Sequence, residues 1–344
     1  MRRLLALLLW SSLGTCVLAQ SEPLAIDTDE RLPLVLTSAS IFADMTTMVA
    51  GGHVRIQSIV PIGGDPHIYE PTPADVKLVA QADLILINGL TFEGWMNELI
   101  ANSGTRATTV IITEGIGTIA SEEYANASDP HAWMTAKNGR TYIENIRDAL
   151  IKLDPFNRKV YEFNANVYTQ QLEALDQEIF QQIATIPEKD RILITSHDAF
   201  RYYGRHYGIR VEAALGTSTD AEVQTDDVNR LTATIRSSGV PAIFVESTIN
   251  PKLIRQIAAD NDVIIGGYLY ADSLGEPDTE AGTYAGMLRY NTATIVEALR
   301  GRRADIAASL NPDRGQQFIL LGIILTVMAC AFFFMVFRIN QGIA

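Results

Sequence analysis

Three of the five histidines stand in loops that follow or separate predicted strands and helices. His67 lies in the loop Pro61–Pro71, directly after the apolar run 54–60, and His131 and His197 occupy comparable loops further along. The loops after the carboxyl ends of strands are where open α/β sheets collect their ligands. A single histidine in such a loop is more often structural than functional, so it is the recurrence of the placement that indicates a site.

A carboxylate completes the set, because Asp272 stands in the loop after the last predicted strand. If two lobes face each other, His67 and His131 come from one lobe, and His197 and Asp272 come from the other. Three neutral imidazoles and one carboxylate suit a borderline divalent cation such as Zn²⁺ or Mn²⁺. The spacings match no local zinc-finger pattern, so distant parts of the chain must assemble the site.

Composition narrows the classes of ligand and partner. The formal net charge is −13 and the isoelectric point is near 4.8, which argues against nucleic acid as a partner because nucleic acid requires a basic surface. The two cysteines, Cys16 and Cys330, fall in apolar segments at the ends of the chain. The folded body therefore has no disulfide and no thiolate ligand, and a metal site must use imidazole and carboxylate.

The first 19 residues have the composition of a secretory signal peptide. Two arginines precede a short apolar core, and Ala19 supplies the small residue at a cleavage site. The alternative is a lipoprotein signal that ends at Cys16. The mature protein is therefore expected on the periplasmic or extracellular face of the cell.

A second apolar run, 318–337, is long enough to cross a bilayer as a helix. A polar tether, 301–317, precedes it and Arg338 follows it. Export of the N-terminus would leave the folded body outside the membrane and Arg338 inside. The helix 318–337 would then anchor the folded body to the membrane. The arginines on the outer side do not favour this orientation by the positive-inside rule: Arg300, Arg302, Arg303 and Arg314.

Between the two ends, short β-rich runs alternate with helical patterns, which predicts parallel sheets with helical crossovers. We expect an α/β fold with an N-terminal lobe at 32–153, a linking helix at 155–186 and a C-terminal lobe at 190–300. Thr72 before Pro73 predicts a helix start, and 115–137 is predicted to be loop. The predicted strands are 34–38, 54–60, 83–88, 109–112, 191–195, 209–215, 242–246 and 263–266.

Four segments carry a family resemblance. Gly64–Pro71, Asp129–Trp133, Thr195–Tyr203 and Leu269–Gly275 resemble, in this order, the four ligand motifs of the metal-binding solute-binding proteins of bacterial ABC importers. These proteins are the zinc, manganese and iron receptors of uptake systems. The resemblance covers residues 34–300, which is nearly the whole folded body.

The resemblance implies two (β/α) lobes with parallel sheets, joined by one long rigid helix, and a metal cleft between the lobes. It implies that His67, His131, His197 and Asp272 bind one metal ion, which the protein delivers to an ABC permease with a cytoplasmic ATPase. His197 stands where manganese-type members often have glutamate, and the chain lacks the long His-rich loop and the cysteine pair of many zinc receptors. Mn²⁺ and Zn²⁺ both stay open, with Fe²⁺ as a third candidate.

Two other functions stay open at this point, a secreted metal-dependent hydrolase and a membrane-anchored adhesin with a structural metal. A catalytic metal keeps an open position for water and a base nearby. The sequence contains no HExxH motif, and four ligands leave little room for a substrate. We therefore expect a receptor and not an enzyme.

Glu246 ends a buried predicted strand, where it either accepts a hydrogen bond from a ligand imidazole or is a solvated strand end. His53 is predicted to cap a helix or lie on the surface, and His206 to face solvent or pack on a tyrosine. Asp65 and Tyr69 are expected to shape the first loop. Trp133 is expected in the core.

Overall fold

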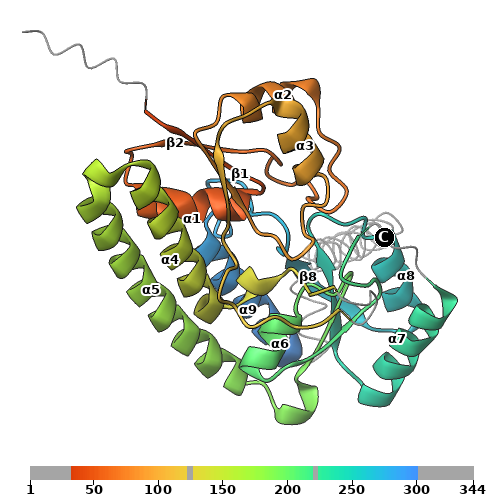
Figure 1. Cartoon of the computed structure of the whole chain (residues 1–344). Helices are drawn as coiled ribbons and strands as arrows, with labels where there is room; N and C mark the ends of the chain where they lie inside the picture. The colour runs from red at the N-terminus through yellow and green to blue at the C-terminus, as the bar shows by residue number, and fades with distance from the viewer. Residues whose placement is uncertain (1–31, 122–126, 220–223, 301–344) are drawn as a thin grey trace, which may run out of the picture. The chain divides into compact units, whose positions relative to one another are not determined.

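The computed structural model describes residues 32–121, 127–219 and 224–300 (Figure 1). The predicted signal peptide, the tether 301–317 and the predicted membrane helix 318–337 lie outside these residues. Within the described ranges, no helix has the length and apolar character needed to cross a bilayer. The fold described below is that of the compact unit that begins at Pro33.

The first group of elements is built on a parallel four-stranded sheet with the order β2-β1-β3-β4. The four strands are β1 (Leu34–Thr37), β2 (Arg55–Ser58), β3 (Leu84–Ile87) and β4 (Thr108–Ile111). The central strands β1 and β3 are fully buried, as continuous apolar runs in a parallel sheet require. Helical crossovers connect the strands: α1 (Ser40–Ala50), α2 (Pro73–Ala80) and α3 (Met96–Ser103).

Helix α2 begins where the sequence predicts. The Thr72 side chain accepts a hydrogen bond from the backbone N–H of Asp75, whose carboxylate in turn accepts one from the backbone N–H of Thr72. This capping box satisfies two of the free amides of the helix start, and Pro73 occupies the first helical position. The first loop is thereby joined to a fixed helix end.

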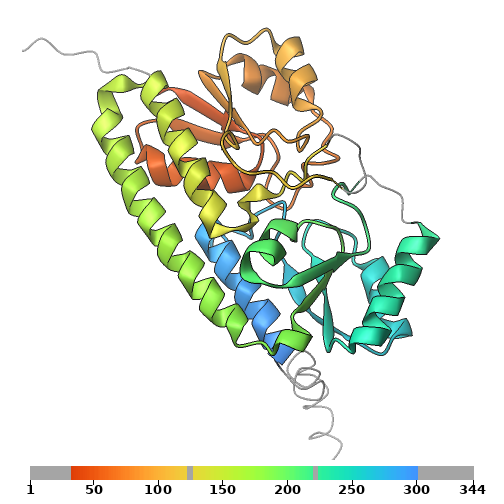
Figure 2. The ribbon, with the colours of Figure 1, turned by 60° about the horizontal axis from the view of Figure 1, so that its bottom comes forward.

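Two antiparallel helices follow, α4 (Ala136–Leu153) and α5 (Arg158–Ala184). Helix α4 begins at Ala136, so the prediction that 115–137 is loop is wrong for its last two residues. Thr135 supplies the N-cap by accepting a hydrogen bond from the N–H of Asn138. Helix α5 contacts α1 in the first group and α9 (Tyr284–Arg300) near the C-terminus (Figure 2).

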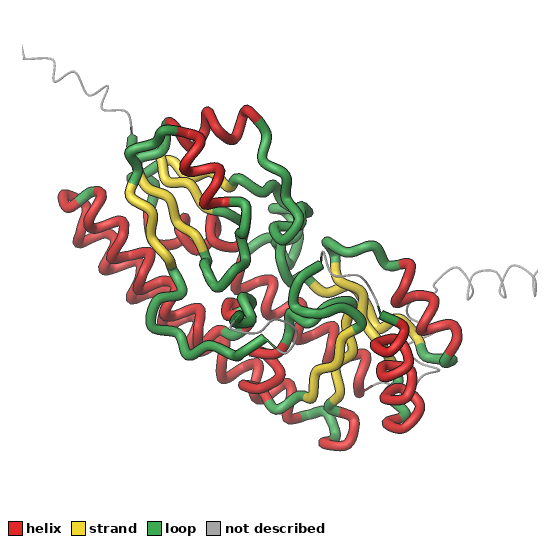
Figure 3. The backbone as a smooth tube through the Cα atoms, turned by 45° about the vertical axis from the view of Figure 1, so that its right-hand side comes forward, coloured by secondary structure: helices red, strands yellow, loops and turns green. Residues whose placement is uncertain are grey.

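The second group contains two parallel strand pairs, β5-β6 and β7-β8. The strands are β5 (Ile192–Thr195), β6 (Arg210–Ala213), β7 (Ala242–Glu246) and β8 (Ile264–Leu269), and β5 contacts β7. The helices of this group are α6 (Arg201–Tyr207), α7 (Thr225–Ser238), α8 (Lys252–Asp260) and α9. Figure 3 shows the two groups of strands with loops between them.

One large core cluster runs through both groups. It contains Phe42 of α1, Tyr142 of α4, Tyr203 of α6 and Tyr284 of α9, all at 0% exposure. The predicted α/β fold, with parallel strands in two groups joined by a long helix, is confirmed. The lobe boundaries stay a prediction, because the continuous core places both groups in one compact unit.

Candidate metal centre

The structure brings together the four side chains that the sequence singles out. His67, His131, His197 and Asp272 each offer one ligand atom, and these four atoms lie within 4.8 Å of one another. The Nε2 atom of His131 is 3.2 Å from Nε2 of His67 and 3.3 Å from Nε2 of His197. The Asp272 carboxylate oxygens lie 3.9, 3.4 and 3.2 Å from the Nε2 atoms of His67, His131 and His197.

Most of these separations are close to those between ligand atoms in a tetrahedral metal site. Zn²⁺ binds imidazole nitrogen and carboxylate oxygen at about 2.0–2.2 Å, which places the corners of a regular tetrahedron about 3.3–3.6 Å apart. Nε2 of His131 lies close to this spacing from Nε2 of His67 and of His197, and Asp272 Oδ2 lies 3.2 Å from Nε2 of His197 but 3.9 Å from that of His67. The group is therefore compact enough to surround one small divalent cation.

Asp272 gives independent evidence for a positive ligand. Its side chain is 1% exposed, and neither carboxylate oxygen has a hydrogen-bond partner among the described residues. Burial of the carboxyl raises its pKa, but the adjacent imidazoles of His197, His131 and His67 outweigh burial and hold that pKa well below its usual range. A buried carboxylate without hydrogen bonds is costly unless a cation compensates it.

The three imidazoles differ in their affinity for protons. Burial lowers the pKa of His67 to about 3. Burial also acts on His131, but its hydrogen bond with Asp129 and the adjacent carboxylate of Asp272 outweigh burial and raise its pKa to about 9. The pKa of His197 rises well above its usual value in spite of burial, because Glu246 and Asp272 lie beside it. In the absence of a metal, protons supply the positive charge that the carboxylates need.

The carboxyl ends of three strands of the second group converge on the site. His197 follows β5 by two residues, Glu246 ends β7, and Asp272 follows β8 by three. Glu246 is fully buried. Its Oε1 accepts a hydrogen bond of 2.8 Å from the backbone N–H of His197, and its Oε2 lies 2.5 Å from His197 Nδ1. Of the two predicted alternatives, the structure therefore favours the partner of a ligand imidazole over a solvated strand end.

A repeated Asp-Pro-His sequence positions the two histidines of the first group. Asp65 Oδ1 accepts a hydrogen bond of 2.9 Å from the backbone N–H of His67, and Asp129 Oδ1 does the same for His131 at 2.9 Å. Asp129 Oδ1 also lies 2.8 Å from His131 Nδ1, which turns Nε2 toward the site. This role of Asp129 is not among the expectations from the sequence, although the repeated tripeptide is a signal for it.

A strained turn supports His67 from behind. Leu90 and Thr91 have φ values of 53° and 67°, which non-glycine residues rarely adopt. Glu93 stabilises the turn by accepting hydrogen bonds from the N–H groups of Asn88 and Gly89. The turn places the ring of Phe92 edge-on against His67, with centroids 5.0 Å apart. Nothing in the sequence pattern points to this contact.

The other residues singled out in the sequence make packing contacts or hydrogen bonds outside the group of four clustered side chains. His53 is half-buried and packs edge-on against Tyr161, while His206 packs on Tyr207 and pairs with Asp176 at 2.9 Å. Asp65 and Tyr69 shape the first loop, since Asp65 also accepts a hydrogen bond from Thr219, and Tyr69 donates one to Asp75. Trp133 is fully buried in the core, as predicted.

A buried group of three imidazoles and one carboxylate, held between two parallel β/α groups, defines a metal-binding protein. The chain belongs to the family described as zinc-uptake complex component A, periplasmic, whose model matches residues 35–298. The family resemblance seen in the sequence is thereby confirmed.

Relatives of known name extend the family assignment. The manganese-binding lipoprotein MntA of Halalkalibacterium halodurans is 35% identical over 265 residues, which is 77% of this chain and 88% of the relative. The manganese ABC transporter substrate-binding lipoprotein PsaA of Streptococcus pneumoniae is 35% identical over 273 residues, with the same two coverages.

Solved structures agree with the fold. The periplasmic zinc-binding protein TroA of Treponema pallidum superposes with a TM-score of 0.75 at 35% identity, covering 78% of this chain and 99% of TroA. A manganese-bound periplasmic metal-binding protein from Candidatus Liberibacter asiaticus, an S38A mutant, superposes with a TM-score of 0.73 at 34% identity and the same coverages.

Proposed function

We propose that this protein is an extracytoplasmic receptor that binds one divalent transition metal ion, Mn²⁺ or Zn²⁺, and delivers it to an ABC permease for uptake. The ligands are His67, His131, His197 and Asp272. The observation that carries the proposal is the buried Asp272 carboxylate, which lacks hydrogen bonds and lies within 4 Å of three imidazole Nε2 atoms. The relatives named as metal or manganese ABC transporter substrate-binding proteins support the transport role.

The geometry suits capture better than catalysis. Three of the four ligands are buried and His67 is only partly exposed, so an ion bound by all four has little room for a reacting water. A metal-dependent hydrolase needs an open coordination position and a base that faces it. Glu246 and Asp129, two carboxylates beside the site, each lie against the Nδ1 atom of a ligand histidine and do not face the position of the ion.

Metal analysis of the purified full chain tests the site. We expect one ion per chain in the native protein and a substoichiometric amount in the His67→Ala variant. The matched control is His53→Ala, which removes an imidazole outside the cluster and should retain one ion per chain. Full metal content in His67→Ala would show that the ligand assignment is wrong.

The identity of the ion requires a measurement in cells. Sites of nitrogen and oxygen ligands generally bind Zn²⁺ more tightly than Mn²⁺, so affinity in a test tube does not identify the physiological cargo. We expect the metal that is bound to protein isolated from cells to be the same metal whose depletion from the medium limits growth. Recovery of neither Mn²⁺ nor Zn²⁺ from cells supplied with both would contradict the proposal.

The mode of membrane attachment belongs to the same proposal. The apolar run 318–337 would tether the receptor beside its permease and raise the effective concentration for docking. Several relatives are named lipoproteins, which makes an N-terminal anchor at Cys16 the competing arrangement. Mass spectrometry of the mature N-terminus separates the two, because lipidation at Cys16 and cleavage after Ala19 leave different first residues.

A further inference from the structure

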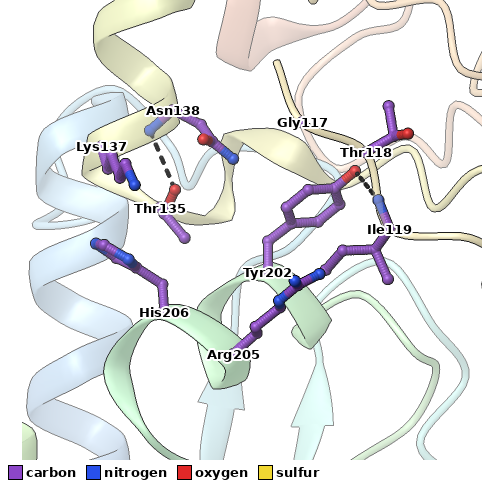
Figure 4. Close-up of a pocket in the computed structure, with 9 residues that line it drawn as sticks. All are labelled: Gly117, Thr118, Ile119, Thr135, Lys137, Asn138, Tyr202, Arg205 and His206. Carbon is purple, nitrogen blue, oxygen red and sulfur yellow. Dashed lines mark hydrogen bonds between the residues drawn. The ribbon is translucent and has the colours of Figure 1, made fainter.

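A cavity lies beside the start of α4 and α6, apart from the four clustered side chains. It has a volume of about 340 Å³ and is lined by residues of the loop 117–119, of the start of α4 and of α6. Figure 4 shows the ring of Tyr202 between these segments, with Arg205 and His206 below it and Lys137 and Asn138 above. The four metal ligands are not among the residues that line it, so this cavity is separate from the metal site.

The lining is basic, although the protein as a whole is strongly acidic. Lys137, Arg205 and His206 face the cavity, and none of the residues that line it is acidic. Within the described ranges, neither Lys137 nor Arg205 takes part in an ion pair, whereas His206 is balanced by Asp176 at 2.9 Å. Both side chains are exposed at the mouth of the cavity, so they give it a local positive charge on a chain whose net charge is −13.

The charged hydrogen-bond donors at the cavity are side chains. Two amides at the start of α4 already have partners, since Ala136 donates to Tyr207 Oη and Asn138 to Thr135 Oγ1. The ammonium of Lys137 and the guanidinium of Arg205 remain, and both form strong charge-assisted hydrogen bonds with oxyanions. The nearby N-terminus of α4 adds a favourable field for negative charge.

We propose that this cavity binds a small oxyanion, a phosphate or carboxylate group, through Lys137 and Arg205. Tyr202 forms one wall and connects the cavity to the metal centre. Its hydroxyl accepts a hydrogen bond from the N–H of Ile119 and donates one to the carbonyl of Asp129, the residue that orients His131. The proposal does not depend on the metal function, because no metal ligand lines the cavity.

Isothermal titration of the metal-free full chain tests the proposal. Inorganic phosphate and succinate serve as separate probes, at about 0.15 M salt to screen weak surface contacts. We expect one of them to bind in a saturable manner with a stoichiometry of one and a dissociation constant of about 1 mM or lower. Replacement of both cations, Lys137→Met with Arg205→Met, should weaken this binding at least about tenfold.

The matched control is the double variant Lys152→Met with Lys159→Met, which removes two charges that do not line the cavity. This control and His67→Ala should both retain the native affinity for the anion. Retention of the metal by the Lys137 and Arg205 double variant shows that it is folded. The absence of saturable binding, or equal loss in the control variant, would overturn the proposal.

Discussion

Two carboxylates determine which ring nitrogen His131 and His197 direct toward the other clustered side chains. Glu246 holds the backbone N–H and the Nδ1 side of His197, and Asp129 holds the same two groups of His131. Each imidazole is thereby fixed with Nε2 toward Asp272. Loss of a group that hydrogen-bonds to a metal ligand commonly lowers metal affinity by about 10- to 100-fold.

The Glu246→Gln variant is therefore expected to bind metal about 10- to 100-fold more weakly. An amide offers only one accepting oxygen, so either the N–H or the Nδ1 side of His197 faces an N–H donor instead. Competition with a fluorescent chelator measures the affinity. Glu212→Gln, on the neighbouring strand β6 and ion-paired with arginines at the surface, is the matched control, and a loss of the same size there would contradict the role given to Glu246.

Metal binding is also expected to release protons. In the metal-free protein at pH 7, His131, whose pKa is raised to about 9, carries a proton, whereas His67, whose pKa is lowered to about 3, does not. An ion that takes His131 Nε2 must displace that proton. Apparent metal affinity should therefore rise with pH up to about 9, and the heat of binding should depend on the ionisation enthalpy of the buffer. A buffer-independent heat at pH 7 would contradict this.

The same shift has a consequence for stability. Because its folded-state pKa is raised, His131 stabilises the metal-free fold fully below about pH 6.5, and this contribution is lost as the pH rises through about 9. The bound ion replaces the proton, so the metal-loaded protein should lack this part of the pH dependence. Urea unfolding of both forms at pH 6.5 and 9 measures the difference.

At the residue scale, the sequence predicts the four clustered side chains and offers one support, Glu246, as an open alternative, but it does not predict the roles of Asp129 and Phe92. The pattern identifies these four residues because each stands in a loop beside a strand or helix that the sequence predicts: His67, His131, His197 and Asp272. Asp129 and Phe92 act through contacts that depend on loop conformation. A positive φ at Leu90 and Thr91 has no signature in those residue types, so the turn that positions Phe92 is visible only in three dimensions.

At the element scale, strand and helix types follow from the pattern, while some ends do not. The predicted strands overlap all the strands of the described residues, because buried parallel strands read as short apolar runs. Helix α4 begins earlier than the sequence predicts, because a buried 3₁₀ turn (Ala132–Met134) leads directly into its N-cap, Thr135. The pattern of apolar residues does not distinguish this turn from a loop, whereas the hydrogen bond from the N–H of Asn138 to the Thr135 side chain identifies the cap.

Close packing of α4 against α9 gives an element-scale prediction at Gly139. A Cβ there would lie 2.5 Å from Tyr284 Oη, and this hydroxyl shares its one proton between the carbonyl oxygens of Trp133 and Thr135. Alanine favours a helix interior by about 1 kcal/mol over glycine, but overpacking costs about 1–3 kcal/mol. We expect Gly139→Ala to lower the free energy of unfolding in urea. Arg140→Ala, at an exposed ion pair, should change it by less than about 0.5 kcal/mol.

At the scale of the whole folded unit, the continuous core limits how far the two groups can move. Helix α5 contacts α1 of the first group, α6 and α9 of the second group, and α4 beside it, and its buried face includes Tyr161, Leu172 and Ile183. Packed interiors shift between discrete arrangements and do not deform freely. The long helix therefore favours a small rocking motion over the wide opening of a hinged receptor.

Distance measurements between spin labels test this expectation. The native cysteines, Cys16 and Cys330, are first replaced by serine, and labels are then placed at the exposed positions Asn97 on α3 and Ala259 on α8. On metal addition, we expect the mean distance to change by less than about 4 Å, because the helices slide within one packed core and do not swing about a hinge. A pair within the second group, Ala233 and Ala259, should not change. A shift of about 10 Å or more across the groups would show that the core separates when the metal leaves.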